Sequence, residues 1–263
     1  MYAFLSELLS DKQGDVTFSC FGLWHLCYLI FAAMVMVIIV LWLKKKDKTM
    51  KQKITSWFIY SAFALYVADF FLMPFAYGEI DIEKLPFHIC TAMCVMNFWS
   101  CHHSGLGKYK QQFAVLGFLS NLVYMIYPAG LMWYQVHPLS YRVVQTLLFH
   151  GLMTGYGLLM LIFGDLQLNW KLRYKDLAVI VGMTLWAVLG NVLYTGEAWG
   201  RTNNFNWFFV TQDPFYMVPE TMAPYIMPFL NVGLFFIVEL LIYGVCYWRT
   251  KREIQRCNQE NVS

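Results

Sequence analysis

Long runs of apolar residues, separated by short charged turns, dominate the chain. A helix needs about 20 consecutive apolar residues to cross the hydrocarbon core of a bilayer. The pattern therefore predicts an all-α polytopic membrane protein, a bundle of about seven transmembrane helices. We expect the spans near 19–43, 54–76, 85–103, 112–134, 142–164, 177–195 and 226–248, with one long connection at 196–225.

The pattern also indicates a single membrane domain, 19–248, with two short flanks. Segment 1–18 lacks the basic start of a cleaved signal peptide, and its apolar residues fit one face of a short interfacial helix. Segment 249–263 is polar and basic, and it is predicted to be a cytoplasmic tail.

Composition supports this class. Hydrophobic residues make up 59% of the chain and charged residues 13%, against roughly a quarter charged in soluble domains. The net charge of +3 is too small to indicate nucleic acid as a partner. Membrane lipids are the expected partners, and the oligomeric state is left open.

The distribution of Lys and Arg predicts the orientation. Fifteen of the 19 basic residues fall on one side of the predicted spans, in the turns near 44–53, 108–110 and 171–175 and in the tail. Basic residues favour the cytoplasmic side. The amino terminus is therefore expected outside and the carboxyl terminus inside, in a multi-pass protein of a plasma membrane of bacterial type.

Polar residues of several predicted spans lie at a similar depth below the outer surface. At about 1.5 Å per helical residue, His88 and Cys90 lie within about 10 Å of that boundary and His150 about 12 Å deep. Intramembrane polar groups usually face the bundle interior and often mark function. The layer therefore predicts a polar pocket open to the outer leaflet, and its further members are Asp69, Gln145, Asn191 and Asn231.

A structural role is the alternative for several of these groups. Membrane Asn and Thr residues often join helices by hydrogen bonds, which suits Asn97, Asn121 and Thr154. Asp69 is equally compatible with structural pairing. Glu239, deep in the last span, must be neutral or paired if it is buried, and a place in a proton path is a further option.

Cys90 and His150 are a candidate nucleophile and base. An imidazole can generate the reactive thiolate, which would take an acyl group from a lipid and pass it to an acceptor or to water. Gln145 and Asn191 are candidate oxyanion donors. A metal site is disfavoured, because residues two apart, such as His88 and Cys90, point to different sides of a helix. No metal and no cofactor is expected.

Short motifs resemble a known family. The segment Leu85–Cys90, LPFHIC, resembles the LPxHLC-type signature of the YwaF-like integral membrane proteins, and Tyr141–Gly151 resembles their aromatic-rich stretch that ends in HG. YPAG at Tyr127–Gly130 matches a proline turn. The stretch 190–209, which includes Asn206, resembles the family's Asn-containing span and the loop that follows it.

The resemblance implies an activity. YwaF-like proteins are distantly similar to a mammalian transmembrane acyltransferase that makes ether phospholipids with a Cys–His pair. Its His corresponds to His150, but its Cys corresponds to Phe87 here, so Cys90 would have to substitute. Membrane hydrolases of branched fatty esters, similar in fold, use Thr and His, a part that Thr91 could take.

The sequence thus favours a membrane-embedded enzyme of lipid acyl chemistry, an acyltransferase or a lipid hydrolase. His150 and Cys90 would be catalytic. The supporting or substrate-binding residues would be His88, Asp69, Gln145, Asn191, Asn231 and Asn206. Two alternatives remain: a transporter or lipid-handling protein without covalent catalysis, and a binding protein that docks a partner through the loop at 196–225.

Overall fold

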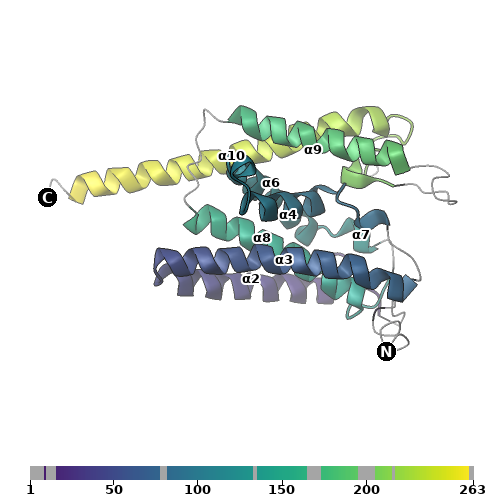
Figure 1. The fold of residues 1–263 in the computed structure, drawn as a ribbon, viewed down its shortest axis with the longest axis horizontal. Helices are drawn as coiled ribbons and strands as arrows, with labels where there is room; N and C mark the ends of the chain where they lie inside the picture. The colour runs from purple at the N-terminus through teal and green to yellow at the C-terminus, as the bar shows by residue number, and fades with distance from the viewer. Residues whose placement is uncertain are drawn as a thin grey trace. The chain divides into compact units, whose positions relative to one another are not determined.

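The described part of the chain is helical throughout. The computed structural model describes residues 9, 16–77, 82–132, 135–164, 173–194, 205–214 and 217–260. Within these ranges the chain forms helices and turns and no strand, so the predicted all-α class is confirmed. In chain order the elements are α2 (Leu23–Lys44), α3 (Lys48–Tyr77), η1 (Ile82–Lys84), α4 (Ile89–Ser100), α5 (Ser104–Gly107), α6 (Lys110–Ile126), α7 (Ala129–Met132), α8 (Tyr141–Phe163), α9 (Arg173–Tyr194), η4 (Trp207–Phe209) and α10 (Ala223–Glu260) (Figure 1).

Six helical stretches of the described residues are long and apolar enough to cross a membrane. Large apolar side chains stay exposed on them, such as Ile38 at 66% in α2, as expected of surfaces that face lipid. The protein is therefore a multi-pass membrane protein. The six stretches are Leu23–Lys44, Lys48–Phe75, Lys110–Met132, Tyr141–Phe163, Arg173–Tyr194 and Ala223–Val245.

The third expected span, 85–103, is shorter than predicted. Its helix, α4, has 12 residues, which gives a length of about 18 Å against a hydrocarbon core of about 30 Å. Pro86 and the extended backbone of His88 (φ −70°, ψ 139°) delay the start of the helix. The apolar run at 85–103 is therefore only partly helical, and the count of seven spans and the orientation stay predictions.

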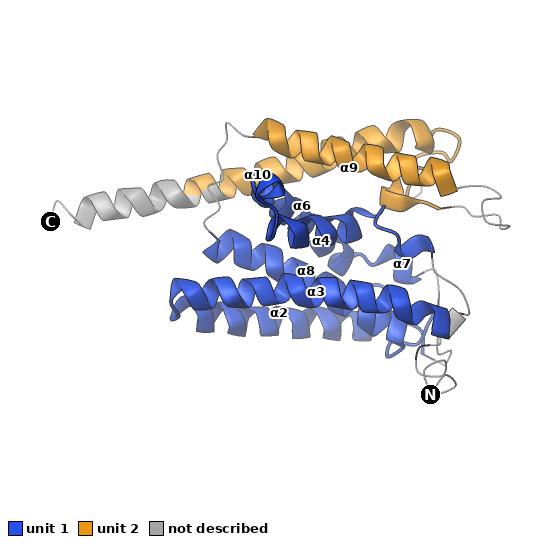
Figure 2. Ribbon diagram, viewed as in Figure 1, with its two compact units in different colours: residues 1–164 blue, residues 165–263 orange. Residues whose placement is uncertain are grey.

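The chain divides into two compact units, residues 1–164 and residues 165–263 (Figure 2). In unit 1, α8 packs against α6 and α3, and α4 packs against α6 and α3. The side chains of Met93, Leu116, Met153 and Leu159 are fully buried among these helices. This four-helix core positions the polar groups described below.

Buried hydrogen bonds tie the start of α2 to the rest of unit 1. His25 is fully buried, and its Nδ1 accepts a hydrogen bond from the Phe21 N–H at 2.9 Å. Its Nε2–H therefore donates to the Met125 carbonyl at 2.8 Å. The Tyr28 hydroxyl donates to the Pro138 carbonyl at 3.0 Å. The bonds to Met125 and Pro138 join α2 to the end of α6 and to the segment before α8, at least 100 residues later in the chain.

Unit 2 consists of α9, η4 and α10. α9 and α10 pack against each other, and η4 packs against both. α10 continues past the predicted end of its span, at 248, as far as Glu260. Pro228 lies inside α10 and Pro74 inside α3, and neither ends its helix.

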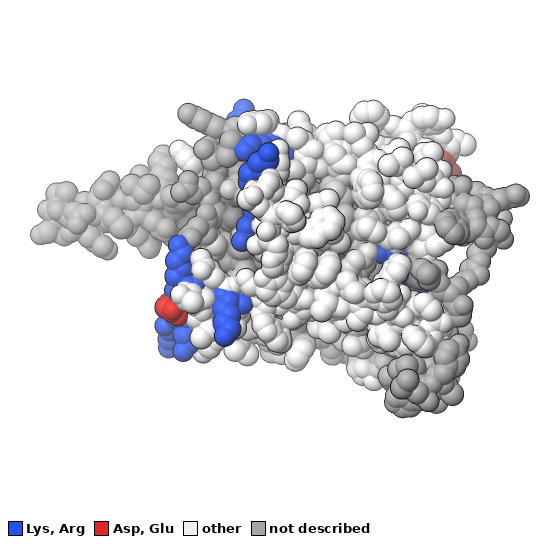
Figure 3. All heavy atoms as spheres, viewed as in Figure 1, with Lys and Arg blue, Asp and Glu red and all other residues white. Residues whose placement is uncertain are grey.

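Basic side chains gather toward the end of unit 1 that holds the connection from α2 to α3 (Figure 3). Lys46 packs its ammonium over the ring of Trp42 at 5.1 Å, and Lys51 packs over Phe163 at 5.2 Å. Both pairs place a cation next to an aromatic ring, as is common at a membrane–water boundary. This end is the one predicted to face the cytoplasm.

The contact between α6 and α8 yields a stability prediction. A Cβ added at Gly157 would lie 2.9 Å from the backbone Cα of Phe118, which cannot move aside easily. We expect Gly157→Ala to lower the free energy of unfolding by about 1–3 kcal/mol through overpacking. Denaturation of the purified protein in mixed micelles measures this.

Gly151→Ala is the matched control in the same helix. A Cβ at Gly151 meets nothing within 4 Å, so the substitution should be neutral or stabilise by up to about 1 kcal/mol. Equal losses in the two variants would contradict the close packing of α8 on α6.

Candidate functional site

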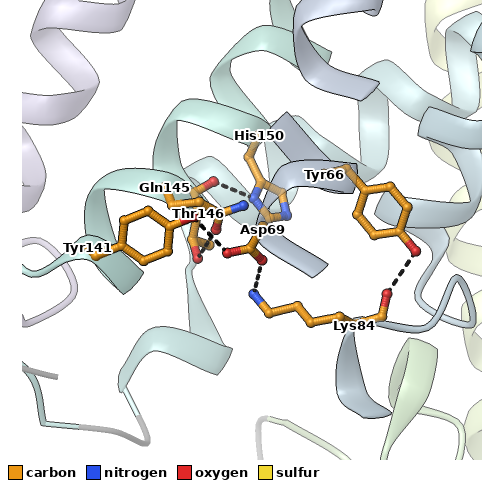
Figure 4. A network of polar contacts seen from close by, with 7 residues as sticks. All are labelled: Tyr66, Asp69, Lys84, Tyr141, Gln145, Thr146 and His150. Carbon is orange, nitrogen blue, oxygen red and sulfur yellow. Dashed lines mark hydrogen bonds and ion pairs between the residues drawn. The ribbon is translucent and has the colours of Figure 1, made fainter. Parts of the chain in front are cut away.

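A buried ion pair joins α3 and η1 in unit 1. Asp69 of α3 is 1% exposed, and its Oδ2 lies 2.7 Å from the Nζ of Lys84 at the end of η1. The Tyr141 hydroxyl, from the start of α8, donates to the other carboxylate oxygen at 3.1 Å. The Tyr66 hydroxyl donates to the Lys84 carbonyl at 2.8 Å. Three elements thus meet at one carboxylate (Figure 4).

The two partners compensate for the burial of the Asp69 charge. A carboxylate taken out of water without a partner is very costly, so it needs a cation and hydrogen-bond donors. Lys84 supplies the charge and Tyr141 a donor. The Lys84 side chain remains 21% exposed. The pair therefore fixes a positive charge near the start of the LPFH segment.

His150 is held in one orientation in the middle of α8. Its Nδ1 lies 2.7 Å from the Thr146 carbonyl oxygen, which can only accept, so Nδ1 carries the proton. The ring stacks on Tyr124 of α6, with centroids 3.8 Å apart and planes 12° apart, and Phe149 meets it edge-on. Nε2 therefore keeps the free lone pair that a general base needs.

Other polar residues of unit 1 lie around His150. His88 and Lys84 are close enough to act on it electrostatically. Gln145 precedes Thr146 on α8, and its Oε1 accepts a hydrogen bond from the Thr146 hydroxyl at 3.3 Å. Asp69, His88, Gln145 and His150 thus lie near one another in unit 1, and Figure 4 shows the part of this group around Asp69.

Cys90 lies on the α4 side of α6. It is 9% exposed, in the first turn of α4, and hydrogen-bonds with Ser120 of α6. Tyr124, on which His150 stacks, follows Ser120 by four residues, or about 6 Å along the helix. In the described structure Cys90 and His150 contact the same stretch of α6 but not each other. Their catalytic pairing stays a prediction.

The alternative nucleophile, Thr91, has its hydroxyl engaged. Thr91 Oγ1 donates to the His88 carbonyl at 3.0 Å, within the first turn of α4. A hydroxyl has one proton to donate. That bond would have to break before Thr91 could pass its proton to His150.

Asn191, Asn206 and Asn231 lie in unit 2, where each binds loop backbone. Asn191 accepts from the Trp207 N–H and donates to the Trp207 carbonyl, both at 3.1 Å. Asn231 donates to the Phe208 carbonyl at 2.7 Å. Asn206 accepts from the backbone N–H groups of residues 211 and 212. All three side chains hold the loop 205–214, and a role in binding substrate stays a prediction.

The loop needs these bonds because its backbone is strained. Phe208 and Phe209 have φ values of 57° and 51°, a left-handed conformation that is unfavourable for bulky residues. Phe205 stacks on Trp207 with ring centroids 4.4 Å apart. Amide clamps from α9 and α10 therefore hold a rigid aromatic turn between two helices of the same unit.

No group of three or more His, Cys, Asp or Glu side chains is placed to bind a metal ion in the ranges that the structure describes. The polar groups around His150 are a carboxylate, an ammonium, hydroxyls and amides, which bind and orient organic groups by hydrogen bonds and charge. The arrangement suits a base that acts on a polar group held beside His150 in unit 1.

Comparison with protein families identifies the chain. One family model, that of the TMEM164 family, matches residues 20–247, which cover both units. The chain belongs to the TMEM164 family. No curated protein and no solved structure matches this TMEM164-family chain significantly.

Several contact residues of this TMEM164-family site, among them Lys84, Ser120 and Tyr124, are not predicted from the sequence. A buried Asp69 needs a cation, and Lys84 is the only Lys or Arg in the sequence between α3 and α4. Ser120 and Tyr124 are four residues apart, so the sequence predicts that they share one face of a helix. It does not predict that this face contacts Cys90 of α4 and His150 of α8.

The ion pair of this TMEM164-family protein yields a prediction. Asp69→Asn leaves the Lys84 ammonium without its anion, so we expect the free energy of unfolding to fall by about 2–3 kcal/mol. Asp47→Asn, at an exposed turn, should change it by less than about 0.5 kcal/mol. Equal effects in denaturation measurements would show that the pair does not stabilise unit 1.

The loop clamp yields a second prediction. Asn191→Ala removes two hydrogen bonds to Trp207, so amide exchange in 205–214 should accelerate roughly tenfold or more. Hydrogen–deuterium exchange with mass spectrometry measures it. Val192→Ala, at a side chain that is 72% exposed, is the control. Unchanged exchange in Asn191→Ala would refute an anchoring role.

Proposed function

We propose that this TMEM164-family protein is a membrane-embedded enzyme of lipid acyl chemistry, an acyltransferase or a hydrolase of lipid esters. The observation that carries the proposal is the state of His150. A carbonyl fixes its Nδ1 proton and an aromatic ring fixes its plane, which leaves Nε2 as an oriented base inside an apolar bundle. Lipid esters reach a site of this kind from the membrane.

Cys90 is the proposed nucleophile. In the first step its thiol proton moves to His150 Nε2, and the sulfur attacks the ester carbonyl. The C–O bond breaks, and the leaving alkoxide takes the proton back from the imidazolium. In the second step an acceptor hydroxyl or water attacks the thioester, and the thiol is restored. This requires Cys90 to leave Ser120 and approach His150.

The supporting residues have distinct proposed roles. Lys84, held by Asp69, puts a positive charge where an anionic head group would lie. Gln145 is a candidate donor to the oxyanion, and His88 a candidate head-group contact. The similarity to YwaF-like proteins and to the ether-phospholipid acyltransferase supports this assignment at His150. Phe87 stands at the acyltransferase's Cys position, so the nucleophile is the part that must differ.

The topology belongs to the same proposal. We place seven spans in a plasma membrane of bacterial type, with the amino terminus outside, so that the layer of His150 lies in the outer leaflet. The Lys-rich connection between α2 and α3 supports this orientation.

Turnover of a labelled phospholipid mixture by the purified protein tests the activity. His150→Ala should reduce turnover by about 10²–10⁴-fold, as for loss of a general base. Cys90→Ala should abolish acyl-enzyme formation, and Cys90→Ser should retain a fraction of it. His103→Ala, at an exposed histidine, should match the wild type.

The variants distinguish which residue is the nucleophile and whether His150 is the base. Loss in His150→Ala with full activity in Cys90→Ala would assign the nucleophile to Thr91 or water. Wild-type turnover by a well-folded His150→Ala variant would end the proposal.

Lipid or solute transport without covalent chemistry is the second candidate. The buried Asp69–Lys84 pair favours it, since intramembrane ion pairs commonly line transport paths. Flux in proteoliposomes that disappears with Asp69→Asn, from a protein that turns over no lipid ester, would decide for transport.

A further inference from the structure

Two carboxyl side chains lie close together inside unit 2, between α9 and α10. Asp176, in the first turn of α9, and Glu239, in the middle of α10, are each 1% exposed. Asp176 is near enough to Glu239 to act on its charge. Tyr243 follows Glu239 by one helical turn, and its hydroxyl donates to Asp176 Oδ2 at 2.9 Å. The cluster is separate from the site of unit 1 in both residues and chemistry.

Glu239 differs from the other buried carboxyl groups of the described residues. Asp69 has a lysine and a tyrosine, and Asp176 has the Tyr243 hydroxyl. Neither carboxyl oxygen of Glu239 has a hydrogen-bond partner, although both are buried. A bare carboxylate in such surroundings, beside a second carboxylate, is strongly disfavoured. Glu239 must therefore hold a positive ligand or a proton.

A proton fits this site better than a metal ion. A metal ion bound by protein oxygens needs several ligands, and the described residues hold no group of three His, Cys, Asp or Glu side chains suited to one. A proton needs only one oxygen. It removes the charge of Glu239, and Asp176 then remains the single anion, stabilised by Tyr243.

Few other charged or titratable groups face the pair. On α10, Tyr243 is the phenol already bonded to Asp176. On α9, the neighbouring charges are Arg173, which is exposed, and Lys175, which is partly exposed, both at the start of the helix. η4, Trp207–Phe209, carries no titratable side chain. Among the described residues of unit 2, Asp176 is the charged neighbour that acts on Glu239.

We propose that Glu239 is a proton-binding site of unit 2, with Asp176 as its ionised neighbour across the contact between α9 and α10. Buried intramembrane carboxyl groups of this kind commonly serve in proton relays. Release of the proton would leave two like charges between the helices, which only water or a cation could stabilise. Deprotonation is therefore coupled to opening of the α9–α10 contact. This site does not depend on the proposed acyl chemistry.

Infrared spectroscopy of the full-length protein in lipid nanodiscs tests the site. A protonated buried carboxyl gives its own C=O stretching band, which moves to lower frequency in D₂O. We expect this band in the wild type at neutral pH and its complete loss in Glu239→Gln. Asp176→Asn should retain it, since Glu239 stays buried without a partner. Glu220→Gln, at an exposed carboxyl, is the matched control and should also retain it.

The variants distinguish the possible results. Circular dichroism and size-exclusion chromatography establish that each variant is folded, and Asp176→Asn gives a second reading if Glu239→Gln does not fold. A band present in the wild type and in folded Asp176→Asn supports the proposal. A wild type without the band overturns it. So does a melting temperature that rises with Na⁺ or Ca²⁺ in the wild type but not in Glu239→Gln, because a metal ion would then hold the site.

Discussion

Polar groups inside an apolar bundle must find their partners within the protein, and this constraint determines the arrangement of unit 1 around Asp69. Its carboxylate draws in Lys84 from η1 and Tyr141 from α8, while Tyr66 of α3 binds the backbone of Lys84. The contact of Tyr141 with Asp69 joins segments 72 residues apart in the chain. The ion pair therefore fixes where the segment before α4 meets α3 and α8, and with it the place of His88 and Cys90.

Unit 2 meets the same constraint with amides rather than charges. Asn191 and Asn231 use their side chains to satisfy the backbone of a turn that contains two left-handed Phe residues. Neutral amides can be buried at lower cost than ions. Glu239 is the exception in this unit, because it is buried with neither an ion partner nor a hydrogen bond. A buried carboxyl group with neither kind of partner points to a bound proton or cation rather than to packing alone.

The sequence predicts those features that depend on composition and helical period. The all-α class and the multi-pass character follow from the length of the apolar runs. The sequence does not predict features that depend on contacts between distant segments. An apolar run alone does not show that Pro86 shortens the helix of α4, that Asn191 binds a loop, or that Lys84 pairs with Asp69. The depth of a residue along a span does not show which neighbouring helix its side chain faces.

The two proposed catalytic groups are held with very different strength, and this bears on how the site would work. The Nδ1–H of His150 donates a hydrogen bond to the Thr146 carbonyl, and its ring stacks on Tyr124, so the ring is fixed. Cys90 has a hydrogen bond to Ser120, and thiols are weak donors and acceptors. Turning the thiol away from Ser120 therefore costs little, whereas turning the imidazole would break two good contacts. With a fixed base and a movable nucleophile, the thiol of Cys90 could adjust its position to the bound ester while the imidazole of His150 stays in place.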